Sequence, residues 1–180
     1  MNTLSIVLIA VLIVLCAIIA WLAISRLRTR HLRSRFGPEY QRAVSEYGDR
    51  AKAERDLARR EDRVQHLDIH PLPPATRDRY LQTWREGQTR FVDDPKGAVM
   101  LAEHLVTEVM RERGYPVAEF ERRVEDISVD HPQLVQNYRA AREIMARQQH
   151  GEASTEDLRR ALVHFRALFD ELLETQEVSR

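Results

Sequence analysis

The sequence predicts an all-α protein with a single N-terminal transmembrane helix, a charged juxtamembrane helix and a soluble bundle of five helices. A long apolar run opens the chain, later segments repeat apolar residues at the helical spacing, and no segment alternates apolar and polar residues as a strand does. The expected parts are a transmembrane anchor at 1–25, a basic juxtamembrane segment at 26–37, a charged stalk helix at 38–69, a proline-rich linker at 70–74, the helical bundle at 75–175 and a tail at 176–180.

The anchor is predicted from nineteen consecutive residues, Ile6 to Ile24, that contain no charged or strongly polar side chain. Thirteen of them are Ile, Leu or Val, each of which favours the bilayer centre by roughly 0.3–0.6 kcal/mol. As a helix the run is about 28 Å long, close to the ~30 Å hydrocarbon core of a bilayer. Apolar residues cover every face of this helix, which disfavours a half-buried helix of a soluble core.

A cleaved leader is an alternative to the anchor. A signal peptide begins with a basic region, continues with about 7–15 apolar residues and ends in small residues of the A-x-A kind. Here residues 1–5 contain no Lys or Arg, the apolar run is longer, and no A-x-A follows it. A lipoprotein signal needs a small residue before the cysteine, whereas Leu15 precedes Cys16. The prediction is therefore an uncleaved signal-anchor.

The predicted topology rests on the arginines that directly follow the apolar run, Arg26, Arg28, Arg30, Arg33 and Arg35. The other flank has no basic side chain, and segments rich in Lys and Arg stay in the cytoplasm. We therefore expect a single-pass protein of the inner (plasma) membrane with its N-terminus outside and its C-terminal domain in the cytoplasm. Trp21, near the same boundary, fits an interfacial aromatic anchor. A stop-transfer signal is a sufficient role for the arginines, and contact with anionic headgroups is a further one.

The charge distribution disfavours a nucleic-acid partner. The formal net charge is zero, but after the arginine segment the chain has 23 basic and 28 acidic residues. A nucleic-acid binder normally has a basic excess or patch in its folded domain. The single cysteine, Cys16, lies within the apolar run, so the chain contains neither an intramolecular disulfide nor a cysteine-based metal site, in agreement with a cytoplasmic domain.

Residues 38–69 are expected to form one charged helix that begins at Pro38 and has a hitch at Gly48. Pairs of opposite charge at i,i+4, such as Glu46 with Arg50, favour a solvated stalk. Self-association through this stalk as a coiled coil is not favoured, because its apolar positions do not continue as a heptad repeat. The prolines at 70–74 predict an extended linker, since each disfavours helix in the residue before it.

Each of the five bundle helices is predicted to bury one apolar face. The most regular pattern follows Asp94-Pro95, a helix start with an N-cap and a proline at the first helical position. Ser154 and Asp157 resemble a capping box at the start of the last helix. The predicted inner faces, helix by helix, are Tyr80, Leu81, Trp84 and Phe91; Ala98, Leu101, Ala102, Leu105, Val106, Val109 and Met110; Val117, Phe120, Val124 and Ile127; Leu134, Val135, Tyr138, Ala141 and Met145; and Leu158, Ala161, Leu162, Phe165, Phe169, Leu172 and Leu173.

No sequence motif assigns a reaction. The chain lacks H-E-x-x-H, a Walker loop, G-x-G-x-x-G and G-x-S-x-G, and no histidine has the Glu-x-x-His spacing of di-iron bundles. His66 and His70 lie four residues apart, but Pro71 disfavours a helix through both. His104 and Glu108 fall beside an apolar face and are expected to be solvated. We predict no catalytic, cofactor-binding or metal-ligating residues, and a protein that is not an enzyme.

Four stretches carry a resemblance to a known family: RFGPEY at 35–40, RFVDDP at 90–95, LVTEVMRERGYP at 105–116 and DHPQLVQNYRAA at 130–141. Together they resemble an uncharacterised family of bacterial proteins, described as secreted or membrane proteins. The resemblance covers nearly the whole chain, and its motifs mark helix caps and core positions. It implies no activity, cofactor or site.

The expected function is that of a membrane-anchored cytoplasmic helical bundle that acts as a protein-interaction or scaffold module for a protein partner that the sequence does not identify. One alternative is a bundle with a ligand pocket or enzymatic site between its helices, near Trp84, His104, Tyr138 or His164. A second alternative is an exported helical protein with a cleaved leader.

Overall fold

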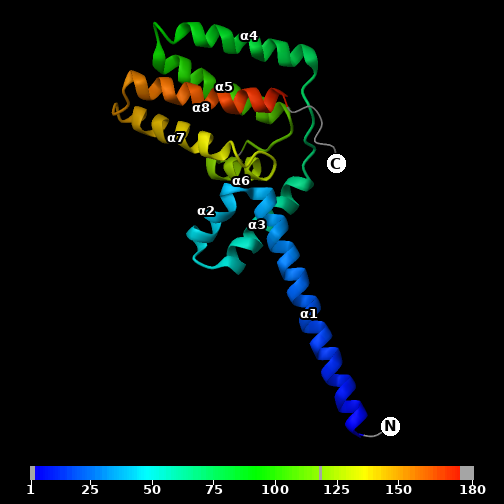
Figure 1. The fold of residues 1–180 in the computed structure, drawn as a ribbon. Helices are drawn as coiled ribbons and strands as arrows, with labels where there is room; N and C mark the ends of the chain where they lie inside the picture. The colour runs from blue at the N-terminus through cyan, green and yellow to red at the C-terminus, as the bar shows by residue number, and fades with distance from the viewer. Residues whose placement is uncertain (1–2, 118, 175–180) are drawn as a thin grey trace. The chain divides into compact units, whose positions relative to one another are not determined.

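The computed structural model describes residues 3–117 and 119–174, with side chains from residue 11 onward (Figure 1). These residues form eight α-helices and no strand, which confirms the all-α prediction. Two compact units divide the chain, which we call the N-terminal unit (residues 1–58) and the bundle unit (residues 59–180). The helices are α1 Thr3–Phe36, α2 Pro38–Tyr47, α3 Arg50–Gln65, α4 Pro74–Arg90, α5 Pro95–Glu112, α6 Phe120–Asp130, α7 Val135–Gln149 and α8 Thr155–Glu174.

Helix α1 joins the apolar run and the arginine segment in one continuous helix. Within the described residues, α1 alone is long and apolar enough to cross a membrane, and none of its apolar stretch is buried. Every residue from Val11 to Arg28 is exposed. The helix ends at Phe36, and Pro38 begins α2, as the sequence of this junction predicts.

The predicted single stalk helix at 38–69 is wrong. The chain turns after α2, where Gly48 N–H donates to the carbonyl oxygen of Val44 (3.1 Å), and starts again as α3. Nor is this region a fully solvated stalk, because both helices contain buried apolar side chains. The buried apolar residues of α2 and of the first half of α3 are Tyr40, Ala43, Ala53 and Leu57.

Glu54 connects the three helices of the N-terminal unit. Its Oε1 accepts hydrogen bonds from the hydroxyl of Thr29 on α1 (2.8 Å), the hydroxyl of Tyr40 on α2 (2.7 Å) and Nε of Arg50 on α3 (2.9 Å). Burial opposes ionisation of this carboxyl, but hydrogen bonds from Arg50, Tyr40 and Thr29 hold the pKa of Glu54 below its usual value. The α2–α3 pair therefore folds back along α1 and is held there by a charged acceptor.

The bundle unit places α4, α5, α8 and α7 side by side, with α6 against α7 (Figure 1). Helices α5 and α8 are central, since α5 packs on both α4 and α8, and α8 packs on α7. Trp84 of α4 stacks on Phe169 of α8, with 4.5 Å between the ring centroids. Every predicted inner-face residue is buried or packs partly buried against the core, and the core also contains buried residues outside the predicted faces, among them Val99, Ile144 and Leu168.

Residues 70–73 of the predicted proline-rich linker are non-helical, whereas Pro74 already begins α4, and the segment is not a boundary between compact parts. Residues 66–73 pack along the bundle unit, with Ile69 and Leu72 against its core. His70 N–H donates to the carbonyl oxygen of Arg113 (3.0 Å) at the end of α5. The division between the two units lies instead within α3, between residues 58 and 59. The proline-rich composition therefore predicted the non-helical backbone of this segment but not its packing against the core.

Gly114 allows this segment to approach the end of α5. Its φ is 94°, and a Cβ added there would lie 2.1 Å from the carbonyl oxygen of Asp68. We expect Gly114→Ala to lower the free energy of unfolding by about 1–3 kcal/mol, measured by thermal unfolding of the bundle unit. Gly151→Ala is the matched control, because Gly151 also has a positive φ, 75°, but a Cβ added there would meet nothing within 4 Å. Equal losses in the two variants would contradict a close approach at Gly114.

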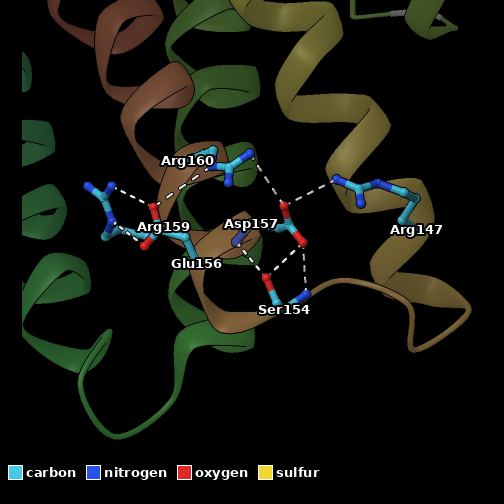
Figure 2. A network of polar contacts seen from close by, with 6 residues as sticks. All are labelled: Arg147, Ser154, Glu156, Asp157, Arg159 and Arg160. Carbon is cyan, nitrogen blue, oxygen red and sulfur yellow. Dashed lines mark hydrogen bonds and ion pairs between the residues drawn. The ribbon is translucent and has the colours of Figure 1, made fainter.

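Two predicted helix starts are confirmed. Asp94 Oδ1 accepts the N–H of Gly97 (2.9 Å) at the start of α5. Figure 2 shows the capping box of α8, in which Ser154 Oγ accepts the N–H of Asp157 (3.1 Å) and Asp157 Oδ2 accepts the N–H of Ser154 (3.0 Å). Arg147, near the end of α7, pairs with the same carboxylate (3.5 Å), so the α7–α8 connection is held at both ends.

Candidate functional site

The residues predicted to mark the membrane boundary all lie on α1. Trp21 is 69% exposed, and Arg26, Arg28, Arg30 and Arg33 are exposed. Arg35 is partly buried, and the guanidinium of Arg33 lies 5.3 Å from the centre of the Tyr40 ring. The last two arginines therefore also contribute to the fold of the N-terminal unit, whereas the first three present their charges to the surroundings.

The four residues considered for an inter-helix pocket are not brought together. Trp84 is stacked in the core, and Tyr138 is buried between Phe120 and Phe165, with ring centroids 4.9 and 6.5 Å away. His164 is partly buried, and its Nδ1 lies 3.1 Å from Oδ1 of Asn137. His104 lines a hollow on the surface of the bundle unit.

That hollow, which we call the α5–α7 groove, has a volume of about 450 Å³, within the usual range of about 300–1,000 Å³ for binding sites. Met100, in its lining, is 63% exposed, whereas Met145 on the facing helix is buried. The eight lining residues are Lys96, Met100, Glu103, His104, Thr107, Met145, Gln148 and Gln149.

Two polar groups of the α5–α7 groove lack a partner within the described residues. The ammonium group of Lys96 forms no ion pair there, and Oε1 of Gln148 is buried without a hydrogen-bond donor. A buried acceptor without a donor costs free energy, so an occupant that supplied an N–H group would recover it. The groove thus offers two methionine side chains, one cation and one open acceptor.

Side chains of the groove lining are held by an ion pair, a hydrogen bond and aromatic contacts. Arg142 Nη1 donates to Glu103 Oε1 (2.9 Å), and Arg123 Nη1 donates to Thr107 Oγ1 (3.0 Å). Both guanidinium groups also face aromatic rings, Arg142 at 5.5 Å from the centre of Phe120 and Arg123 at 6.0 Å from that of Tyr138. Burial raises the pKa of the Tyr138 phenol, which therefore stays neutral at physiological pH.

A separate buried polar cluster lies around His131, where α6 ends. His131 is 5% exposed, its Nδ1 lies 3.2 Å from Oε1 of Glu171, and its Nε2 is buried without a partner among the described residues. Arg113, also buried, donates from Nη1 to the carbonyl oxygen of Leu172 (2.9 Å). Burial and the nearby Arg113 lower the pKa of His131, although Glu171 and Asp130 oppose the shift.

This shift predicts a pH dependence of stability. The pKa of His131 is lower in the folded state than the usual 6.5, so as the pH falls below about 6.5 the unfolded chain binds the proton first. We therefore expect the melting temperature of the bundle unit to fall between about pH 7 and pH 5.5. His131→Asn should flatten this dependence, whereas His104→Ala, at an exposed position, should leave it unchanged. An unaltered slope in His131→Asn would refute this origin.

A buried ion pair joins the end of α3 to α6. Asp126 is fully buried (0% exposed), and its Oδ1 accepts a hydrogen bond from Arg63 Nε (2.8 Å). Arg63 Nη2 also donates to Glu125 Oε2 (2.9 Å). Burial raises the pKa of Asp126 although Arg63 and Arg122 oppose this, and its second carboxylate oxygen has no partner within the described residues. The pair holds the last turns of α3 within the bundle unit.

The α5–α7 groove was not predicted as a surface, although His104 was placed beside the apolar face. His131 lies in the stretch DHPQLVQNYRAA, and its burial was not predicted. A histidine next to Pro132 gives no periodic signal of burial. Within the described part of the chain, no group of three or more His, Cys, Asp or Glu residues is arranged to hold a metal ion.

Comparison of the chain with protein-family models, with curated proteins and with solved structures finds no match. The resemblance to an uncharacterised bacterial family therefore remains a prediction from its motifs.

Proposed function

We propose that the protein is a single-pass membrane protein that presents its helical bundle, in the cytoplasm, as an interaction module for a partner protein. The observation that carries the proposal is α1, whose apolar residues are exposed on every face over a length that matches a bilayer. Burying apolar surface is favourable by about 25 cal/mol per Å², so a hydrocarbon environment is the one in which this helix is stable.

The arginine segment supports the orientation. Arg26, Arg28 and Arg30 are exposed directly after the apolar run, in agreement with a cytoplasmic flank. An exported protein with a cleaved leader would instead lose α1, and sequencing the N-terminus of the mature chain distinguishes the two. Retention of the first residues is the expected result.

The α5–α7 groove is the surface that we propose for the partner. Its lining follows α5 from Lys96 to Thr107, about 16 Å along the helix axis, which is the length of three helical turns. The exposed Met100 supplies a flexible apolar contact, and the ammonium group of Lys96 favours an acidic side chain at one end. We propose that the occupant is an amphipathic helix of the partner, with apolar residues toward Met100 and an acidic residue near Lys96.

Site-specific photocrosslinking in cells tests this surface. A photoreactive residue at Met100 should crosslink to a discrete protein, whereas one at Val163, which is also apolar and exposed but is not part of the groove lining, should not. Met100→Glu should then abolish recovery of that protein, and Val163→Glu should not. Equal crosslinking at both positions, or none at either, would contradict a protein interaction through the groove.

The alternative function is the binding of a small molecule in the α5–α7 groove. Its volume of about 450 Å³ and the presence of His104 would suit a small molecule. A small ligand would raise the melting temperature of the purified protein without any protein crosslink at Met100. The protein-interaction proposal predicts the opposite pair of results.

A further inference from the structure

A second hollow lies in the N-terminal unit, between α1 and the first turns of α3. Its volume is about 230 Å³, and Trp21, Ile24, Ser25 and Arg28 of α1 face Ala51, Glu54 and Arg55 of α3 across it. The hydrogen bond from Thr29 to Glu54 (2.8 Å) fixes the register of the two helices. The start of α3 therefore lies beside the point on α1 where the apolar run gives way to polar residues.

If α1 spans the membrane, as proposed above, this hollow lies at the boundary between hydrocarbon and water. Trp21 and Ile24 form its apolar wall, and both are exposed. Ser25 and Arg28 lie one turn further along α1, where a lipid headgroup begins. Tryptophan prefers this interfacial level, because its ring is apolar and its N–H is polar.

The charges of the hollow favour an anion. Arg28 forms no hydrogen bond or ion pair within the described residues, and Arg55 donates from Nε only to the carbonyl oxygen of Ala51 (3.1 Å). Glu54 is the one carboxylate in the lining, and its charge is already balanced by Arg50. Two guanidinium groups thus have donors available on opposite walls.

We propose that this hollow binds the phosphate of an anionic phospholipid headgroup, held by Arg28 and Arg55, with Ser25 as a further donor and Trp21 and Ile24 against the upper acyl chain. Guanidinium groups bind phosphate oxygens through two parallel hydrogen bonds, which a Lys ammonium cannot do. A lipid is favoured over a soluble phosphate because one wall of the hollow is apolar and exposed. The inference rests on the membrane-spanning α1 of the proposed function.

The test uses the full-length protein in nanodiscs that contain phosphatidylcholine with or without phosphatidylglycerol. Native mass spectrometry after release from the nanodiscs counts the lipids that stay bound. The protein should retain phosphatidylglycerol, and Arg28→Gln with Arg55→Gln should weaken this retention by about tenfold or more, since each replaces a hydrogen bond to a charged group.

Arg26→Gln with Arg30→Gln is the matched control. It removes the same charge from the same region of the chain, but neither residue lines the hollow. Circular dichroism should show unchanged helix content in both double variants, because all four side chains are exposed. Equal weakening in the two double variants would show a general surface attraction and overturn the site. No retention by the unaltered protein would overturn it as well.

Two further experiments distinguish a lipid phosphate from a soluble phosphate and test whether α1 spans the membrane. Excess inorganic phosphate should not displace phosphatidylglycerol. Displacement under the same condition would show that the hollow binds a soluble phosphate instead. Carbonate extraction of cell membranes tests the premise independently. A chain that resists extraction but retains no lipid loses this site alone, whereas a chain released by carbonate loses the proposed membrane span.

Discussion

Replacing Leu105 with alanine is expected to lower the free energy of unfolding of the bundle unit by about 2–5 kcal/mol. Leu105 is 4% exposed and lies on the central helix α5, which packs on both α4 and α8. Removing its buried methyl groups leaves a cavity that packed neighbours fill only in part. Since domains of this size have about 5–15 kcal/mol of stability in total, the variant should melt well below the unaltered protein.

His104→Ala is the control for this prediction, because it changes the neighbouring position on the same helix. His104 is exposed, so its replacement should change stability by less than about 0.5 kcal/mol. Thermal unfolding followed by circular dichroism, on a fragment that begins at Arg59, measures both. Similar losses in the two variants would contradict the inner face of α5 as described.

Replacing the arginines that follow the apolar run with glutamine should turn a uniform membrane orientation into a mixture. The variant changes Arg26, Arg28, Arg30, Arg33 and Arg35, and leaves the apolar residues of α1 as they are. Insertion should persist, because the apolar residues alone favour it, while the charge difference between the two flanks disappears. Protease protection of a C-terminal tag in sealed vesicles measures the fraction in each orientation.

The contribution of Arg33 and Arg35 to the N-terminal unit requires a second variant. Arg33 lies over Tyr40 and Arg35 is partly buried, so a variant that keeps both and changes Arg26, Arg28 and Arg30 separates charge from folding. It should already shift the orientation partly. Neutralising three exposed arginines of the bundle unit, Arg85, Arg90 and Arg122, should leave the orientation uniform. A uniform orientation in every variant would mean that another feature sets the topology.

The helices of the bundle unit could be predicted from sequence because each carries one apolar face at the helical spacing. Asp94 and Ser154 marked two helix starts correctly, since capping depends on residues within one turn. The buried face of α5 followed in the same way from local periodicity.

The stalk prediction failed because burial in α2 and α3 depends on contacts between helices rather than on local composition. Ala53 and Leu57 are isolated among charged residues, so no apolar periodicity predicts that they are buried. The hydrogen bond between Thr29 and Glu54 shows that α3 contacts α1 at this point. The prediction of a free linker at the proline-rich segment failed for a related reason. The segment is bound to the end of α5 by a backbone hydrogen bond between His70 and Arg113, which side-chain composition does not predict. Local composition does not encode such contacts.

The α5–α7 groove and the hollow between α1 and α3 could not be predicted from local sequence patterns either. Each is made by two helices whose pairing the sequence does not state, α5 with α7 and α1 with α3. Single residues such as His104 and Arg28 were noted, but their common environment depends on the fold. His131 shows the same limit, because its neighbours Arg113 and Glu171 come from other parts of the bundle unit.

By the proposed function, α1 crosses the membrane once and leaves the bundle unit in the cytoplasm. Fusions placed after Arg180 test it most directly, one to a fluorescent protein that matures only in the cytoplasm and one to a phosphatase that is active only outside it. We expect fluorescence in the membrane fraction and no phosphatase activity. An active phosphatase, with a dark fluorescent fusion, would place the bundle unit outside the cell membrane and contradict this topology.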